Sequence, residues 1–328
     1  MKKLSFKWGV LLMALFAAAF LSWSCGGSSG GGTTASQTLT PANIDASSAA
    51  TVTGMAMSTG DISDFAGTWV DRIIYNDTAA QQTQSSRSLA AWVLEKIREG
   101  FASGTIINEN DLSRGAIEIP PEDCGEGGTV SLSGTWTGAD DAELCDVSNA
   151  TVTMRFSNCV ESGESVNGTI TVHISGNLCA ATAMSISFNG FSLNSSEMNV
   201  TAADFDLSMT ALQWSGEDIT HMTVTLDGDI AVDSFSMQFA HYAVDITTSG
   251  SDQTVTISGS LTGDCLDGWV TFSTLDPVQA SDSSECPHGG SVQISGSTDI
   301  TVIFNSDGSV EVGDQHYESC LDLPDSCQ

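Results

Sequence analysis

The feature that most constrains the fold is an alternation of apolar and polar residues that begins after Pro121 and persists to the C-terminus. In one run Val152, Met154 and Phe156 alternate with threonine and arginine side chains. Because successive side chains of a strand point to opposite faces, a period of two indicates strands with one dry face and one wet face. The same pattern recurs at 170–174, 184–188, 205–209, 222–226, 235–239 and 300–304.

Three Asn-Gly or Asp-Gly pairs lie between alternating runs, at 167–168, 189–190 and 227–228. Both dipeptides favour the positive φ of two-residue hairpin turns, so we expect β-hairpins there. Roughly a dozen strands would then form an antiparallel meander. The predicted fold class is mainly β, a sandwich or a closed or partly open barrel, with a short N-terminal helical segment.

The apolar positions of these strands are rich in methionine and phenylalanine. They include Met154, Met184, Met209, Met222, Met237, Phe156, Phe188, Phe205, Phe235 and Phe239. Such residues fill ordinary cores, and they also line adaptable pockets for lipids. We expect an ordinary core, with a cavity for a hydrophobic small molecule as the alternative. A membrane-spanning barrel would need aromatic girdles, and the chain has only three tyrosines.

The pattern over 39–120 is helical. Thr40 can cap a helix, Pro41 suits its first position, and Asp45 lies early in the first turns, where the helix dipole favours an anion. A second helix is indicated by apolar residues three and four apart. They are Leu89, Trp92, Val93, Ile97 and Phe101. We expect this stripe to pack on the β-domain, or alternatively to bind a partner or lipid surface.

The N-terminus resembles a bacterial lipoprotein signal. Three lysines precede an apolar run over 8–20, and Cys25 is followed by a Gly/Ser-rich tether. The motif departs from the usual pattern in one respect, because Ser22 stands where leucine is usual and the leucine is one residue earlier. The resemblance implies that a signal peptide, 1–24, is removed and that Cys25 is acylated, for example with palmitate. An ordinary cleaved signal is the alternative.

The expected organisation is a signal peptide at 1–24, a tether at 25–38, a helical segment at 39–120 and a β-domain with disulfides at 121–328.

Acyl chains bind a membrane with roughly 0.8 kcal/mol per buried methylene. Lipoproteins retained at the inner membrane tend to have aspartate after the cysteine, and here that residue is Gly26. The resemblance therefore implies a lipid anchor in the outer membrane, at its periplasmic face or at the cell surface.

Eight cysteines follow Cys25, namely Cys124, Cys145, Cys159, Cys179, Cys265, Cys286, Cys320 and Cys327. An even number of cysteines in an exported chain predicts disulfides. The chain lacks the C-x2-C pair that is typical of zinc sites. Antiparallel pairing of three successive runs brings Cys124 to Cys159 at one end of the sheet and Cys145 to Cys179 at the other. We predict these two bonds. The other four cysteines can pair in three ways.

The charge is strongly asymmetric, because no Lys or Arg follows Arg155 whereas 24 of the 41 acidic residues do. A net charge of −32 argues against nucleic acid as a partner. The carboxylates are expected to form a solvated surface, with calcium as an alternative. The calcium candidates are Asp227 with Asp229, Asp264 with Asp267, and Asp140 with Asp141 and Glu143. None completes a calcium-binding loop, so no metal residue is assigned.

No catalytic motif is present, neither a G-x-S-x-G elbow, an H-E-x-x-H pair nor a phosphate-binding glycine loop. His173 and His221 fall on predicted wet faces, and His241 lies where the alternation breaks. Histidines in such places are usually surface or strand-end residues. We therefore predict no catalytic residue, no cofactor and no enzymatic activity.

Two short segments resemble exported lipoproteins of unknown role in Gram-negative bacteria. They are Leu-Thr-Pro-Ala-Asn-Ile-Asp at 39–45 and Phe-Ser-Asn-Cys at 156–159. This resemblance implies a location and no activity. We expect a non-catalytic envelope lipoprotein that binds an envelope component, or has a structural role, at the outer membrane. The alternative is a carrier that holds a hydrophobic ligand in an apolar β-cavity.

Overall fold

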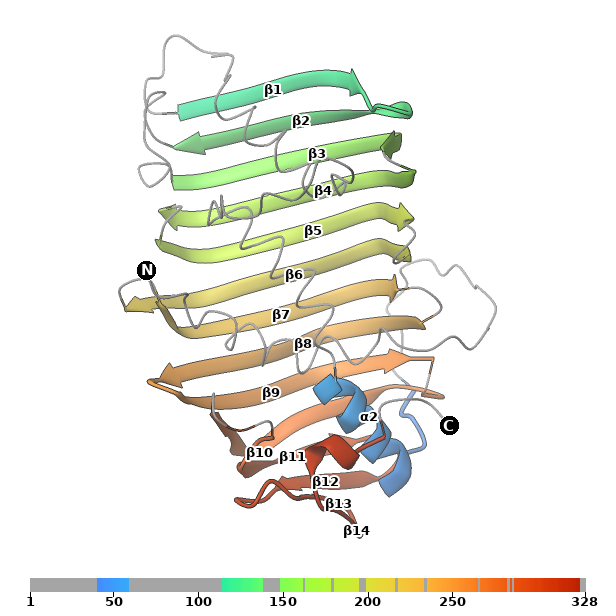
Figure 1. Ribbon diagram of the computed structural model, residues 1–328, viewed down its shortest axis with the longest axis vertical. Helices are drawn as coiled ribbons and strands as arrows, with labels where there is room; N and C mark the ends of the chain where they lie inside the picture. Colours follow the sequence, from blue (N-terminus) through green and yellow to red (C-terminus); the bar gives the residue numbers. More distant parts are fainter. Residues whose placement is uncertain are drawn as a thin grey trace. The chain divides into compact units, whose positions relative to one another are not determined.

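The computed structural model describes residues 40–58, 114–137, 148–161, 163–177, 180–194, 199–215, 218–232, 235–264, 266–281, 284 and 286–324. Its strands are hydrogen-bonded in chain order from β1 to β14 without a crossover (Figure 1). This is the predicted meander, so the mainly β fold class is confirmed. The order does not close into a ring, which leaves the sandwich and the partly open barrel of the predicted alternatives. None of the described helices is long and apolar enough to span a bilayer.

The chain divides into two compact units, 66–212 and 1–65 with 213–328. The first holds β1 (Arg114–Asp123), β2 (Gly127–Thr137), β3 (Ser148–Glu161), β4 (Glu164–Asn177), β5 (Ala180–Asn194) and most of β6 (Asn199–Ser215). The second holds α2 (Ala46–Ser58), β7 (Asp218–Val232), β8 (Phe235–Ser249), β9 (Asp252–Gly263), β10 (Val270–Ser281), β11 (Gly289–Ser295), β12 (Asp299–Phe304), β13 (Val310–Val312), β14 (Gln315–Tyr317) and the 3-10 helix η2 (Cys320–Asp322). In this second unit α2 packs against β12, β13 and η2.

Burial alternates along the strands as the sequence predicts. Most of the Met and Phe residues predicted for the dry face are buried, namely Met154, Met184, Met209, Met222, Met237, Phe156, Phe205 and Phe239. Phe188 is half-buried, and the side chain of Phe235 lies outside the described residues. We call the side that carries these residues the apolar face and the opposite side, rich in Ser, Thr and Asp, the polar face.

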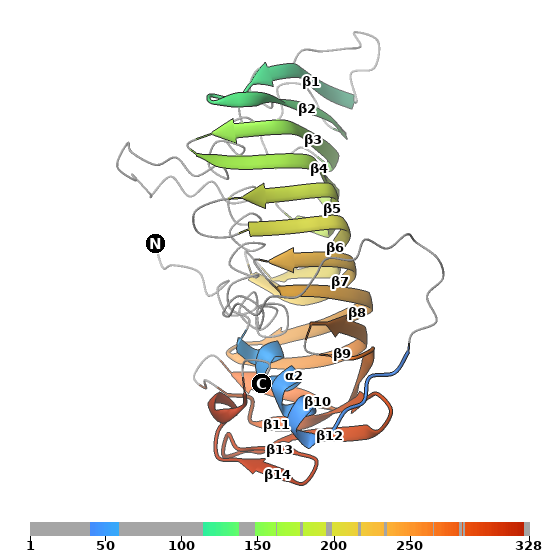
Figure 2. The ribbon, with the colours of Figure 1, turned by 90° about the vertical axis from the view of Figure 1, so that its right-hand side faces the viewer.

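The three predicted hairpin turns are wrong. Gly168, Gly190 and Gly228 lie inside β4, β5 and β7, with φ of 99°, 54° and 98°. The β4–β5 register shifts between Asn167 and Thr169, and the β7–β8 register shifts at Gly228. A β-bulge with glycine at its first position uses the same positive φ as a hairpin turn, so the dipeptide alone does not distinguish them. Bulged strands bend, and Figure 2 shows strands that curve along their length.

The bulges of neighbouring strands lie side by side, and glycine is required where they meet. A Cβ on Gly168 would lie 2.2 Å from the carbonyl oxygen of Gly190. A Cβ on Gly259 would lie 2.1 Å from the carbonyl oxygen of His241. Both distances are far below van der Waals contact, and the obstructing atoms belong to the backbone. A side chain at either position would therefore force the two strands apart.

The predicted boundary between a helical segment at 39–120 and a β-domain at 121–328 lies too far toward the C-terminus. β1 begins at Arg114, so 114–120 is strand. The exposed Pro120 and Pro121 lie inside β1, where the register with β2 shifts. Proline is tolerated there because β1 has a single neighbour in the sheet order. The predicted second helix, with its stripe at 89–101, lies outside the described residues.

The start of α2 also corrects the predicted caps. Asp45, rather than Thr40, caps the helix, because its Oδ1 accepts the backbone N–H of Ser48 at 2.8 Å while its own N–H donates to Ser48 Oγ at 2.8 Å. The hydrogen bonds that the Asp45 carboxylate accepts from Ser48, first from its backbone N–H and then from its hydroxyl, lower the pKa of the Asp45 carboxyl. Thr40 instead precedes the helix, where its carbonyl oxygen accepts the N–H of Trp269 at 2.8 Å.

Two disulfides are present among the described residues. Cys124 bonds Cys159 with a Cα–Cα distance of 5.5 Å, the pairing that the strand register predicts. Cys286 bonds Cys320 with a Cα–Cα distance of 5.7 Å, which selects one of the three pairings left open. The predicted Cys145–Cys179 bond, the cysteines at 265 and 327 and the lipidation site Cys25 lie outside the described residues.

The stacked bulges predict that Gly259→Ala destabilises the protein by about 3 kcal/mol or more, because the new Cβ meets backbone at a positive φ. Gly250→Ala is the matched control, since Gly250 also has a positive φ but nothing lies within 4 Å of its Cβ position. We expect this control to cost about 1 kcal/mol. Urea unfolding followed by circular dichroism measures both values. Equal losses in the two variants would contradict the stacking of the bulges.

Candidate functional site: the polar face of the sheet

Hydroxyl side chains form a row across four strands of the first unit. Ser133, Thr153, Thr171 and Ser187 are directly opposite one another in β2, β3, β4 and β5. The hydroxyls of Thr153 and Thr171 are 3.2 Å apart and hydrogen-bonded. Neighbouring strands are about 4.8 Å apart, so this row repeats donors and acceptors at that interval. We call it the hydroxyl row.

A second row of polar residues lies one repeat further along the same strands, and it includes His173. Thr135, Thr151, His173 and Ser185 are its members. The Nδ1 atom of His173 is 2.7 Å from the hydroxyl of Thr151, and its Nε2 atom is 3.3 Å from that of Ser175. His173 is exposed, as predicted, and both of its ring nitrogens have a hydroxyl partner.

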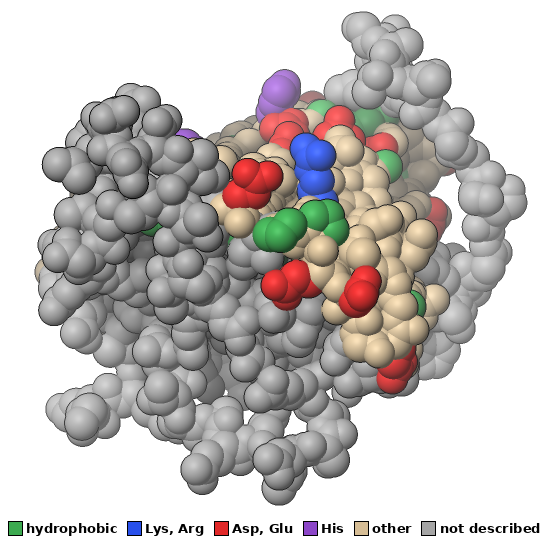
Figure 3. Space-filling view, turned by 90° about the horizontal axis from the view of Figure 1, so that it is seen from above, with side chains coloured by type: hydrophobic (Ala, Val, Ile, Leu, Met, Phe, Trp, Pro, Cys, Tyr) green, Lys and Arg blue, Asp and Glu red, His purple; other side chains and the backbone are tan. Residues whose placement is uncertain are grey.

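Arg155 lies on the same face, beside the hydroxyl row. Its neighbours across the strands are Ser131 and Thr169, and its side chain is exposed. Figure 3 shows carboxylates scattered over a described surface that is mainly uncharged. No Lys or Arg follows Arg155 in the chain, so the polar faces of the later strands have no Lys or Arg to balance their carboxylates.

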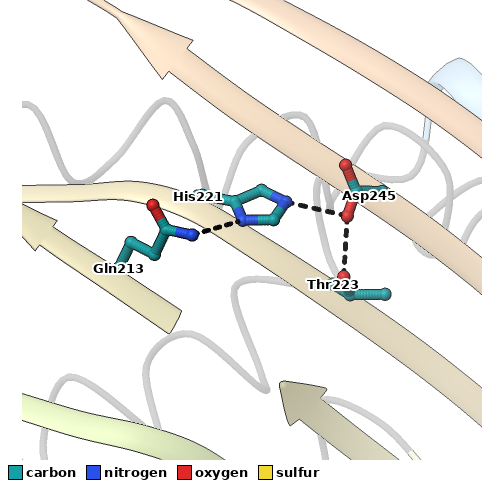
Figure 4. Close-up of polar contacts among 4 residues, drawn as sticks. All are labelled: Gln213, His221, Thr223 and Asp245. Carbon is teal, nitrogen blue, oxygen red and sulfur yellow. Dashed lines mark hydrogen bonds and ion pairs between the residues drawn. The ribbon is translucent and has the colours of Figure 1, made fainter. Parts of the chain in front are cut away.

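The most connected polar group of the second unit is the His221 cluster, made of Gln213, His221, Thr223 and Asp245 (Figure 4). His221 Nε2 is 3.0 Å from Asp245 Oδ2, and the Thr223 hydroxyl donates to the same oxygen at 2.7 Å. Gln213 Nε2 is 3.2 Å from His221 Nδ1. The side chains of His221 and Asp245 are 26% and 40% exposed.

Strand register explains why these residues meet. His221 and Thr223 are two residues apart in β7, so they share a face. Thr223 is directly opposite Asp245 in β8, which makes His221 the diagonal neighbour of that carboxylate. Gln213, near the end of β6, approaches the ring from the other side. The cluster therefore connects β6, β7 and β8 through side chains.

The hydrogen bonds define the chemistry that the His221 cluster can perform. A neutral ring that donates from Nε2 to Asp245 must accept the Gln213 amide at Nδ1. Both nitrogens are then engaged, so no lone pair is directed at a substrate, as a general base requires. The Thr223 hydroxyl and the Asp245 carboxylate are bonded to each other, and the carboxylate also accepts from the ring. The arrangement is a cross-strand connection on the polar face.

The calcium candidates bind donors of the protein itself. Asp227 accepts the backbone N–H of His241 at 2.6 Å and lies 3.1 Å from its ring Nδ1. Asp264 accepts the N–H and the hydroxyl of Ser236, and Asp267 accepts the N–H of Asn43. No group of three or more His, Cys, Asp or Glu side chains able to hold a metal occurs in the described part of the chain. The trio at 140–143 lies outside it.

The apolar face of the second unit contains two polar atoms without a partner. Among the described residues these are the Tyr242 hydroxyl and Gln253 Oε1, both buried. The Tyr242 ring lies 5.7 Å from those of Phe239 and Phe272. Burial raises the pKa of Tyr242 far above its usual range, so the hydroxyl stays neutral. The sequence gives no signal for either atom, since strand pairing decides what surrounds them.

The His221 cluster predicts that Asp245→Ala lowers the free energy of unfolding by about 1–2 kcal/mol, because a half-buried ring and a hydroxyl lose their common acceptor. Asp252→Ala is the control, since Asp252 is an exposed carboxylate at the start of β9. We expect this control to change stability by less than about 0.5 kcal/mol. Thermal and urea unfolding at pH 7 measure both variants. An equal effect of the two substitutions would contradict a connecting role for Asp245.

Comparison of the chain with protein-family models, with curated proteins and with solved structures finds no match. The polar face offers extended rows of hydroxyl, amide and carboxylate groups, and neighbouring side chains bind the rings of His173, His221 and His241. Such a surface can bind an extended partner through many weak hydrogen bonds.

Proposed function

We propose that this chain is a non-catalytic lipoprotein that binds an extended envelope component, a polysaccharide, through the polar face of its β-sheet. The observation that carries the proposal is the hydroxyl row, in which Ser133, Thr153, Thr171 and Ser187 follow one another across four strands. The lipid on Cys25 would anchor the chain in the outer membrane, and the tether would give the sheet reach.

The chemistry of the row favours a sugar polymer. Hydroxyl groups both donate and accept, so they match the hydroxyls of a polysaccharide in several orientations. A repeat of about 4.8 Å between strands presents these groups at short regular intervals along one direction. A net charge of −32 disfavours polyanions, which leaves neutral or amino-sugar polymers as the favoured class.

A second candidate function is supported by the buried Tyr242 hydroxyl. An unpartnered donor among Phe239 and Phe272 would suit an apolar ligand with one polar group. This is the hydrophobic carrier, and it uses the apolar face. One observation separates the two functions. A carrier produced without Cys25 would still release a lipid into organic solvent, and a polysaccharide-binding protein produced in the same way would not.

The test uses the secreted chain from residue 26 onward, in co-sedimentation with insoluble neutral and amino-sugar polysaccharides. We expect sedimentation with at least one of them. We expect the double variant Thr153→Val with Thr171→Val to bind roughly tenfold more weakly, because two central hydroxyls are lost.

The control is Thr210→Val, which removes an exposed hydroxyl of β6 outside the hydroxyl row. This variant should bind like the unmodified chain. The proposal fails if no polysaccharide sediments the protein, or if the double variant and the control bind equally well. Circular dichroism of each variant shows whether its sheet is intact.

A further inference from the structure

The outer edge of β1 is the feature that carries a further inference. Arg114 to Ile119 pair with Thr137 to Leu132 of β2, and β1 has no second neighbour in the sheet order. Within the described residues, no backbone hydrogen bond joins another segment to this stretch. The side of an edge strand that has no neighbour in the sheet order is a template for a further strand.

We propose that β1 pairs with β1 of a second copy of this chain, antiparallel and about a two-fold axis at Ala116. Pro120 and Pro121 have no N–H and end the available edge, so the pairing involves residues up to Ile119. The edge is thus about one short strand long. An isologous pair uses it once and leaves nothing for a third copy.

Charge complementarity selects the register. With the axis at Ala116, Arg114 lies directly opposite Glu118 of the second copy, and the symmetry repeats this pair. With the axis at Glu118, two carboxylates would be opposite each other, which is unfavourable. With the axis at Ile117, Arg114 would be opposite a proline. Only the axis at Ala116 opposes unlike charges and keeps proline out of the ladder.

The same register preserves the two faces. Glu118 is exposed and lies opposite Ser133 of β2, so it belongs to the polar face. Position 114 is an even number of residues from Glu118, so this register pairs strand positions of the same parity. The dimer would therefore continue each face from one copy into the other. It is independent of the ligand proposed above, since it uses a sheet edge rather than the hydroxyl row.

Engineered disulfides test the register in the chain from residue 26 onward. Ala116→Cys should form a covalent dimer under mild oxidation, because opposed residues have Cα atoms about 4.5–5.5 Å apart, within disulfide range. Glu118→Cys alone should not, because its two copies would be four residues apart along the strand, about 13 Å. A mixture of Arg114→Cys and Glu118→Cys chains should form a mixed dimer. Equal cross-linking of the two single variants would overturn the register.

Charge reversal tests the association without cross-links. Glu118→Arg should raise the dimer Kd roughly tenfold, because each of the two pairs becomes a repulsion. Adding Arg114→Glu should restore the original Kd, since the charges are again opposite. Analytical ultracentrifugation measures all three proteins. A chain that is monomeric at every concentration, or a double variant no tighter than Glu118→Arg, would overturn the proposal. Polysaccharide binding by a monomeric chain would leave the proposed function intact.

Discussion

The separation of apolar and polar side chains onto two faces is the constraint on which the rest of the structure depends. It is maintained over long strands by pairing register, and a slip of one residue would reverse every side chain. The bulges are compatible with this separation because each inserts an extra residue, which shifts the alternation of buried and exposed residues only at that point. In β8 the buried residues of the described side chains are Met237 and Phe239 before His241, and Tyr242, Val244 and Ile246 after it. The apolar face therefore continues through the bend.

The sequence predicts the faces well because they depend only on local alternation. The Met and Phe positions, the wet-face histidines and the Cys124–Cys159 bond all follow from period two and antiparallel pairing. An Asn-Gly or Asp-Gly pair does not separate bulges from hairpins, because both can use a positive φ. The spacing of apolar residues is a better sequence signal for a bulge. Phe156 and Cys159 are three residues apart and both buried, and the register of β3 shifts between them.

Other features required information that local patterns do not contain. The sequence pattern does not predict the start of β1, because two prolines near the end of this strand suggest a break and an edge strand tolerates them. The Cys286–Cys320 bond joins a loop to η2 after the very short strands β13 and β14, in which alternation is too brief to indicate register. The partners of His221 lie on two other strands, β6 and β8, so they are identified only once the strands are paired.

Thiol accessibility along β7 tests the two-faced sheet most directly. Single cysteines at Val224 and Thr225 differ by one residue, and the structure places the first among buried residues and the second on the half-exposed polar face. Labelling of the folded protein with a thiol reagent should be fast for Thr225→Cys. It should be slower by at least roughly a hundredfold for Val224→Cys, whose thiol becomes accessible only on opening of the sheet. Equal labelling rates, or faster labelling at 224, would contradict the account.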